Sequence, residues 1–311
     1  AGAILLEFDT SVRSEGMGGA GVAAFWGEDP DMWANPANIA HQRGVRYAEM
    51  ESQLVPDLAD NIWLRDTWLT AGFGGVGVLV ARGPLDGALL DMGTMEYADD
   101  GGEVLGTFDA YSKAERLGVG VSLFEMLEQA GAAGGRTWSR HGDLSLGYTH
   151  ISYQDHLGPD PILHDLVGGS YEGTAASYGV QARLTPLDTR RTDGSEGPLG
   201  GVRVDLAYGR SVLNRTDAFI IHADATDGDP YPRLHVQGWS FHMETGFPPA
   251  LRGACESASL GWLADSLTPL VSFGYAEQTA EPGIVWNSAV GTYAYEHDTS
   301  GLNDEESWGW E

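Results

Sequence analysis

The side chains able to carry catalysis or bind a metal lie scattered along this chain of 311 residues. Its 9 histidines include no H-E-x-x-H motif, and its single cysteine, Cys255, has no cysteine or histidine at zinc-site spacing. His235 and His242 are seven positions apart on one predicted strand, so their side chains point to opposite faces. The sequence therefore predicts no enzyme active site, no metal site and no cofactor.

Two further patterns are weak versions of known ligand loops. The run Gly16-x-Gly18-Gly19-x-Gly21 suggests a dinucleotide loop, but Pro30 and Pro36 interrupt the region where a helix should follow. Residues 224–229 contain three aspartates and resemble part of a calcium loop, yet the later glutamate of such loops is missing. A glycine-rich connection and a solvated acidic loop explain these two patterns better.

The charge of the chain limits its partners. It carries 45 acidic and 17 basic residues, for a net charge of −28. Binding to nucleic acid needs clusters of basic residues, so nucleic acid is not expected as a partner. The same balance argues against docking on anionic lipid through a polybasic patch. A single cysteine also excludes a disulfide within the chain.

Residues 14–40 are too rich in glycine for a helix and too irregular for a strand. Pro30 and Pro36 each remove a backbone donor and disfavour helix at the preceding residue. The segment is nonetheless rich in large apolar side chains: Met17, Val22, Phe25, Trp26, Met32, Trp33 and Ile39. We therefore predict a compact segment that the rest of the chain encloses, the alternative being a glycine-rich surface loop.

A family resemblance rests on this region, on Arg13, the run Met17-Gly18-Gly19-Ala20, Val22-Ala23 and Asn35-Pro36-Ala37. These residues resemble the N-terminus of outer-membrane barrels of the fatty-acid transporter (FadL) type and, more closely, of the PorV-type barrels of bacterial secretion systems. The resemblance covers about 30 residues and implies a barrel of about 14 strands. In those families the two motifs form an N-terminal hatch inside the barrel.

The remainder of the chain shows alternation with a period of two residues. Leu117, Val119 and Val121 alternate with small residues, and the same pattern recurs along the chain. One face of each strand is thus apolar, which suits lipid, and the other is small and polar, as in a lumen. We predict strands at 44–53, 61–71, 75–83, 103–112, 115–126, 143–154, 174–185, 201–211, 233–245, 257–265, 268–279 and 287–297, with a further strand beginning near Glu306.

The predicted fold is accordingly all-β, an antiparallel transmembrane β-barrel of about 12 to 14 strands. Residues 1–43 form an N-terminal plug and residues 44–311 form the barrel. Residues 123–129 favour one or two helical turns. The chain stops at Glu311 just as a strand begins, whereas barrels of this type usually finish on a full strand. The biological chain is therefore expected to continue, or the barrel to close in an unusual way.

The expected function is transport or capture of an apolar ligand, or assistance to protein secretion, by a mature outer-membrane protein without its signal peptide. The predicted partners are outer-membrane lipid, a long-chain apolar ligand or a secreted protein, with self-assembly also possible. The predicted apolar ligand contacts are Met17, Phe25, Trp26, Met32 and Trp33, and the predicted carboxylate anchors are Arg13 and Arg203. The predicted plug motif comprises Gly18, Gly19, Asn35, Pro36 and Ala37. The alternatives are a structural envelope barrel that assembles through loops or edges, and a soluble secreted β-protein.

Overall fold

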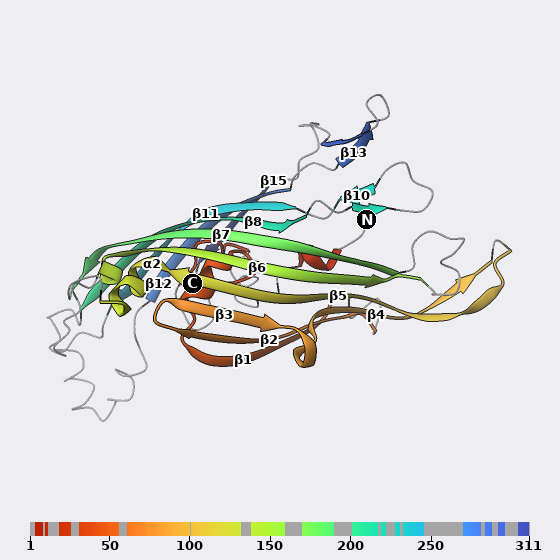
Figure 1. Ribbon diagram of the computed structural model, residues 1–311, viewed down its shortest axis with the longest axis horizontal. Helices are drawn as coiled ribbons and strands as arrows, with labels where there is room; N and C mark the ends of the chain where they lie inside the picture. Colours follow the sequence, from red (N-terminus) through yellow and green to blue (C-terminus); the bar gives the residue numbers. More distant parts are fainter. Residues whose placement is uncertain are drawn as a thin grey trace.

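The computed structural model is dominated by one antiparallel sheet of 11 strands (Figure 1). This confirms the prediction of an all-β, antiparallel fold. The described residues are 4–8, 10–11, 19–25, 31–55, 61–99, 101–131, 138–158, 170–189, 201–216, 219–221, 228–230, 233–245, 270–280, 284–287, 292–295 and 304–310.

The sheet runs in chain order from β1 to β15. Its strands are β1 (Gly44–Gln53), β2 (Trp63–Phe73), β3 (Val76–Ala81), β4 (Gly87–Ala98), β5 (Val104–Ser122), β6 (Gly142–His156), β7 (Ser170–Asp188), β8 (Val202–Arg215), β11 (Leu234–Thr245), β12 (Leu270–Ala280) and β15 (Asp304–Trp310). Within the described residues, β1 and β15 are its two edges.

β3 and β4 together fill one position of the sheet, between β2 and β5. The C-terminal half of β2 (residues 69–73) pairs with β3, and its N-terminal half (residues 63–67) pairs with β4. On the other side, the C-terminal part of β5 pairs with β3 and its N-terminal part pairs with β4. The short 3-10 helix η3 (Gly83–Leu85) interrupts this position. β4 was missed by the sequence analysis, because Gly87, Gly93 and a register shift between Asp91 and Thr94 break its alternation.

β5 is a single strand, where the sequence analysis predicted two with a break at 113–114. The charged residues there do not end the strand, because they lie on its outward face and form ion pairs. Lys113 Nζ lies 3.6 Å from Asp86 Oδ1 and 3.3 Å from Glu115 Oε1, and Glu115 also lies 3.1 Å from Arg82 Nε. Exposed, paired charges are compatible with a strand face directed to water.

The remaining elements are short. They are the 3-10 helices η1 (Ile4–Glu7), η2 (Pro36–His41) and η4 (Trp138–Arg140), the helix α2 (Leu123–Gln129), and the strand pairs β9 (Phe219–Ile221) with β10 (Gly228–Pro230) and β13 (Ile284–Asn287) with β14 (Thr292–Tyr295). The helix α2 confirms the helical turns expected at 123–129. Across the described residues, helices are all too short or too polar to cross a membrane.

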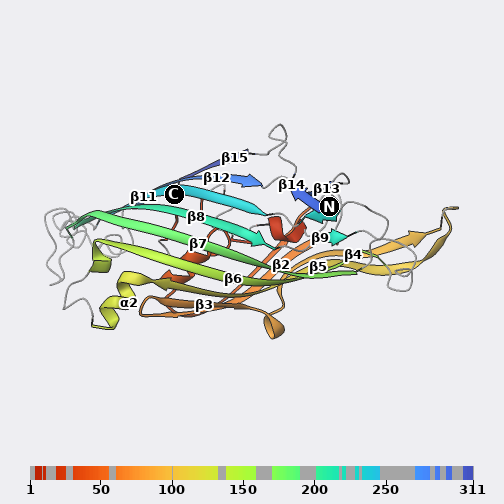
Figure 2. The same ribbon diagram turned by 45° about the horizontal axis from the view of Figure 1, so that its top comes forward.

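The sheet is curved, and the N-terminal segment (described residues 4–8, 10–11, 19–25 and 31–43) lies against its concave side (Figures 1 and 2). The helix η2 alone contacts β2, β3, β5, β6 and β7, so it lies across the strands. We call this covered side the inner face and the opposite side the outer face.

A row of glycines crosses the inner face at right angles to the strands. Gly77 on β3, Gly120 on β5, Gly147 on β6 and Gly179 on β7 are successive cross-strand partners. Beyond them, Gly209 on β8 pairs with Gly238 on β11, and Gly274 on β12 pairs with β15. Because glycine has no side chain, this row forms a shallow channel in which another backbone can lie.

The N-terminal segment lies in this channel. A Cβ atom added to Gly120 would collide with Ile39 and Ala40, one added to Gly147 with the carbonyl group of Pro36, and one added to Gly179 with the side chain of Asn35. Val22 occupies the same place over Gly209. The segment therefore packs backbone against backbone across most of the sheet, and one glycine in each strand makes this possible.

The outer face carries large exposed apolar side chains at the same level. Val78, Val119, Tyr148 and Tyr178 are successive cross-strand partners, and the rings of Tyr148 and Tyr178 lie 5.4 Å apart. On β7 the apolar outward positions run from Ala176 to Leu184, which is roughly 26 Å along the strand. The apolar positions of these strands therefore face away from the N-terminal segment.

The apolar part of the outer face ends at polar residues. On β6 and β7 these are Ser152 and Thr174, which are cross-strand partners. On β8, β11 and β12 they are Arg210, Gln237 and Glu277, with Gln237 Nε2 donating to Glu277 Oε2 at 3.2 Å. The outer face is therefore a band of exposed apolar side chains with a polar border.

Candidate functional site

Two asparagines fix the N-terminal segment to the inner face. Asn35, at the N-cap of η2, accepts a hydrogen bond from Ala37 N at 3.0 Å through its own Oδ1. Its Nδ2 donates to Val22 O at 2.8 Å and to Val180 O at 3.2 Å. Asn35 thus closes its own turn, as its position before Pro36 predicts, and joins two stretches of the segment to β7.

A chain of hydrogen bonds continues from Asn38 into the sheet. Asn38 Nδ2 donates to Asp31 O at 2.6 Å, and Asn38 Oδ1 accepts from Gln181 Nε2 at 2.8 Å. Gln181 Oε1 in turn lies 2.8 Å from His41 Nε2, so this nitrogen carries the proton. All of these amide groups are buried, and satisfying them requires the segment to dock in one register.

His41 is held in its neutral form. Burial and, to a smaller extent, the neighbouring Arg183 guanidinium lower the pKa of His41 from its ordinary 6.5 to about 4, against a smaller opposing effect of Asp143. Ser145 Oγ, which donates to Asp143 Oδ2 at 3.0 Å, also lies 3.2 Å from His41 Nε2. Protonation of His41 therefore opposes docking of the segment.

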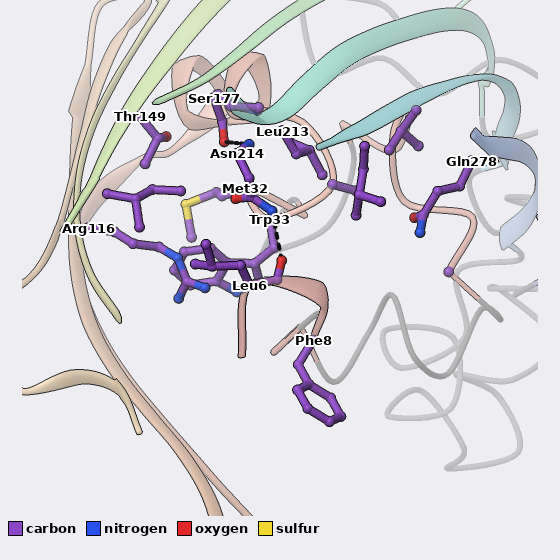
Figure 3. Close-up of a pocket in the computed structure, with 16 residues that line it drawn as sticks. Leu6, Phe8, Met32, Trp33, Arg116, Thr149, Ser177, Leu213, Asn214 and Gln278 are labelled. Carbon is purple, nitrogen blue, oxygen red and sulfur yellow. Dashed lines mark hydrogen bonds between the residues drawn. The ribbon is translucent and has the colours of Figure 1, made fainter. Parts of the chain in front are cut away.

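A cavity of about 300 Å³ lies on the side of the segment away from His41, and both the segment and the inner face of the sheet line it (Figure 3). The N-terminal segment contributes its apolar side chains, and six strands contribute the rest. Its wall comprises Leu6, Phe8, Gly19, Met32, Trp33, Ala34, Pro36, Arg116, Thr149, Ile151, Ser177, Leu213, Asn214, Leu234, Val236 and Gln278. The wall of this concave space combines polar and apolar groups, and a concave site that orients a ligand through a few polar groups is typical of ligand binding.

Arg116 is the charged residue of this wall. Its Nη1 lies 3.3 Å from Asp66 Oδ2 on β2, and both side chains are almost fully buried. The guanidinium also lies over the ring of Trp33, 4.4 Å from its centre. Trp33 in turn meets Trp68 edge to face, with ring centres 5.6 Å apart. Arg116 is thus packed and paired on the strand side of the cavity.

Asp66 also joins the first part of the chain to the site, because Thr10 Oγ1 donates to its Oδ2 at 2.5 Å. The other carboxylate oxygen, Oδ1, has no hydrogen-bond partner among the described residues. A buried carboxylate with both an arginine and a hydroxyl on one oxygen is held in a fixed orientation.

Three strands supply the polar groups of the cavity on the side opposite Phe8. Asn214 has a left-handed backbone (φ 57°), and it donates from its backbone N to Ser177 Oγ at 3.0 Å and from Nδ2 to Leu6 O at 2.9 Å. These bonds join η1 to β7 and β8 (Figure 3). Thr149 is 4% exposed, and its Oγ1 has no hydrogen-bond partner among the described residues.

The predicted site residues do not all meet here. Met32 and Trp33 line the cavity, and so do Gly19 and Pro36 of the predicted plug motif. Phe25 lies on the opposite side of the segment, where the Arg183 guanidinium lies 5.1 Å from its ring centre. Arg203 lies there too, and it pairs with Asp205 at 2.6 Å instead of lining the cavity. Arg13, Met17, Gly18 and Trp26 lie outside the described residues.

Sequence reasoning missed Arg116, Thr149 and Asn214. Arg116 was detectable, because it shares the inward parity of Gly118, Gly120 and Ser122 on β5. Thr149 follows the same parity on β6. Nothing in the sequence places Asn214, since its position depends on the bonds to Leu6 and Ser177.

Comparison with known protein families and curated proteins found no match to this chain. No protein-family model matches the chain, and no curated protein is significantly similar to it. Nor do three or more His, Cys, Asp or Glu side chains gather as possible metal ligands within the part of the chain that the structure describes.

Proposed function

We propose that this chain is an outer-membrane β-barrel of the FadL/PorV type that captures or passes an apolar ligand. The observation that carries the proposal is the outer face, on which contiguous strands expose Val, Leu, Tyr and Trp side chains to the surroundings. In water such a surface marks an interaction site or an aggregation hazard. In a bilayer it is the expected lipid-facing band, which is about 25 Å tall in outer-membrane barrels.

The inner face supports the same proposal. A barrel lumen tolerates polar and small side chains, and here the inner face holds glycine, serine and buried paired charges. The N-terminal segment acts as the plug, held in the glycine row by Asn35 and Asn38. The cavity between the plug and the sheet is the ligand site. Trp33 and Met32 supply its apolar contacts from the plug, so ligand binding and plug position are coupled.

A second candidate is a structural envelope barrel that assembles through its edges. One observation favours it: within the described residues, β1 and β15 each pair with a single strand. An edge in lipid requires a partner for its backbone groups. In the transporter proposal the two edges pair with each other or through further strands of the chain. In the structural proposal they pair with another subunit.

The test is extraction from membranes followed by ligand analysis. We expect the protein to resist carbonate and high salt, to dissolve in detergent, and to retain or bind an apolar ligand as a monomeric particle. Release by carbonate alone would refute the membrane assignment. A detergent-dependent protein that binds no apolar ligand and purifies as an edge-linked assembly would favour the structural candidate.

A further inference from the structure

The charge of the cavity wall bears on which ligand the cavity accepts. Among the described residues that line it, Arg116 is the one with a formal charge, and it is already neutralised. Asp66 Oδ2 lies 3.3 Å from Arg116 Nη1, on β2 two strand positions from β5, and Asp66 is fully buried. An anionic head group near Arg116 would therefore also lie near the carboxylate of Asp66, which repels it.

Trp33 adds to this effect, since its ring covers the guanidinium at 4.4 Å. The face of Arg116 on that side is therefore occupied by an aromatic ring and is closed to an incoming carboxylate. Bidentate recognition of a carboxylate requires the planar fork of arginine to be accessible. Arg116 is thus placed as a structural partner of Asp66 and Trp33.

A different polar group of the wall lacks a hydrogen-bond partner. The hydroxyl of Thr149 is buried, lines the cavity and has no hydrogen-bond partner among the described residues. A buried polar atom without a partner is unfavourable, so a ligand atom that bonds to it contributes to affinity. Ile151, Leu213 and Val236, which also line the cavity, are apolar and suit a hydrocarbon body.

We propose that the cavity selects a neutral apolar molecule with one hydrogen-bonding head group, such as an alcohol, ketone or amide, and discriminates against the matching anion. This inference rests on the proposed function, which makes the cavity a ligand site. It differs from the ligand that the sequence suggests, a carboxylate anchored by arginine. Arg203 forms an ion pair with Asp205 away from the cavity, and Arg116 in the cavity wall already forms an ion pair with Asp66.

The experiment compares two ligands that differ only at the head. The full chain in detergent is titrated with ω-bromododecanol and with ω-bromododecanoate, at a pH where the carboxylate is ionised. Bromine quenches nearby indole fluorescence, and the part of the signal that Trp33→Phe removes reports on the cavity. We expect saturable quenching by the alcohol and at least about 10-fold weaker binding of the carboxylate, which corresponds to about 1.4 kcal/mol.

Two variants sharpen the comparison. Asp66→Asn leaves the shape but removes the negative charge, so the affinity ratio of carboxylate to alcohol should rise at least about 10-fold. Thr149→Val should weaken alcohol binding by roughly 5- to 10-fold, because it removes the hydrogen bond and keeps the volume. Circular dichroism and heat-dependent electrophoretic mobility check that each variant is folded.

The outcomes separate the two proposals. Carboxylate binding as tight as alcohol binding in the wild type, or an unchanged ratio in folded Asp66→Asn, overturns the neutral-ligand inference and leaves the ligand-binding barrel standing. Absence of quenching by both ligands in the folded wild type overturns the ligand-binding function, and with it this inference.

Discussion

The glycine row predicts a sharp effect of adding one methyl group. In Gly147→Ala, the new Cβ would lie well under 3.0 Å from the carbonyl group of Pro36 and the backbone N of Ala37. Both are backbone atoms that cannot rotate away, so the segment must move by about 1 Å or more to regain ordinary contact. Such a shift also strains the three hydrogen bonds of Asn35.

The expected cost follows from these two contributions. Overpacking of a buried site costs about 1–3 kcal/mol, and each weakened hydrogen bond about 1 kcal/mol. We take about 3 kcal/mol for undocking of the segment, which raises its undocked fraction roughly 100-fold. Chymotrypsin cleavage after Trp33, followed by mass spectrometry in detergent, should accelerate by a similar factor, since cleavage tracks the open population.

Gly118→Ala is the matched control. Its Cβ would meet mainly the end of the Ile39 side chain, with Cδ1 at 2.6 Å, and that side chain can rotate. We expect at most about a fivefold acceleration in this variant, or about 1 kcal/mol. Equal cleavage of Gly147→Ala and wild type, with the sheet still folded, would refute the docking of the segment in the glycine row. Equal acceleration in both variants would refute the role of the backbone contact.

Three other predictions follow from the site and the outer face. Because the folded pKa of His41 is about 4, below its ordinary 6.5, docking is fully stable above pH 6.5 and loses about 3 kcal/mol as the pH falls to 4, so the chymotrypsin cleavage rate of the wild type, divided by that of His41→Gln at the same pH, should rise over this range. Leu146→Arg, in the apolar band, should reduce the stability of the protein folded into liposomes by about 2–4 kcal/mol in urea titrations. Ser152→Arg, at the polar border, should change this stability by about 1 kcal/mol or less, and equal effects of the two variants would contradict a lipid-facing band. Arg116→Met should destabilise the protein by about 3–5 kcal/mol because Asp66 is left unpaired, and adding Asp66→Leu should restore most of this in the same titration.

The alternation of the sequence was sufficient to place most strands. β1 has the predicted bounds, and β6, β7, β8, β11 and β12 differ from the predictions by a few residues at their ends. The strand predicted at 257–265 lies outside the described residues. In the main sheet, the errors arose where charge or glycine interrupts the pattern, at 113–114 in β5 and throughout β4. Outside it, the single strand predicted at 287–297 was wrong, because β13 ends at Asn287 and β14 begins at Thr292, and the short strands β9 and β10 were missed. In β5, ion pairs with neighbouring residues accommodate the charges, and β4 is held by its pairing with β2 and β5. The sequence of one strand does not show which strands lie beside it.

The candidate site was less predictable, because which residues meet there depends on the position of each residue along its strand relative to the neighbouring strands. Arg203 has the inward parity that the sequence assigns to it, as does Arg116. The two residues nonetheless lie on opposite sides of the N-terminal segment, since the register of each strand decides its level. The glycines are likewise visible in the sequence, but their alignment into one row follows only from the pairing of β3, β5, β6 and β7.

The alignment of the glycine row joins the cavity to the docked position of the N-terminal segment. Trp33, Met32 and Pro36 lie on the segment, and Arg116, Thr149 and Ser177 lie on the strands, so the cavity exists only while the segment is docked. A ligand that binds the docked form alone stabilises docking by about 2.7 kcal/mol at 100 times its dissociation constant. This matches the expected cost of Gly147→Ala, so saturating ω-bromododecanol should return the cleavage rate of that variant to within a few-fold of wild type. Failure of the alcohol to slow cleavage of Gly147→Ala, while it still quenches Trp33, would mean that the alcohol binds whether or not the N-terminal segment is docked.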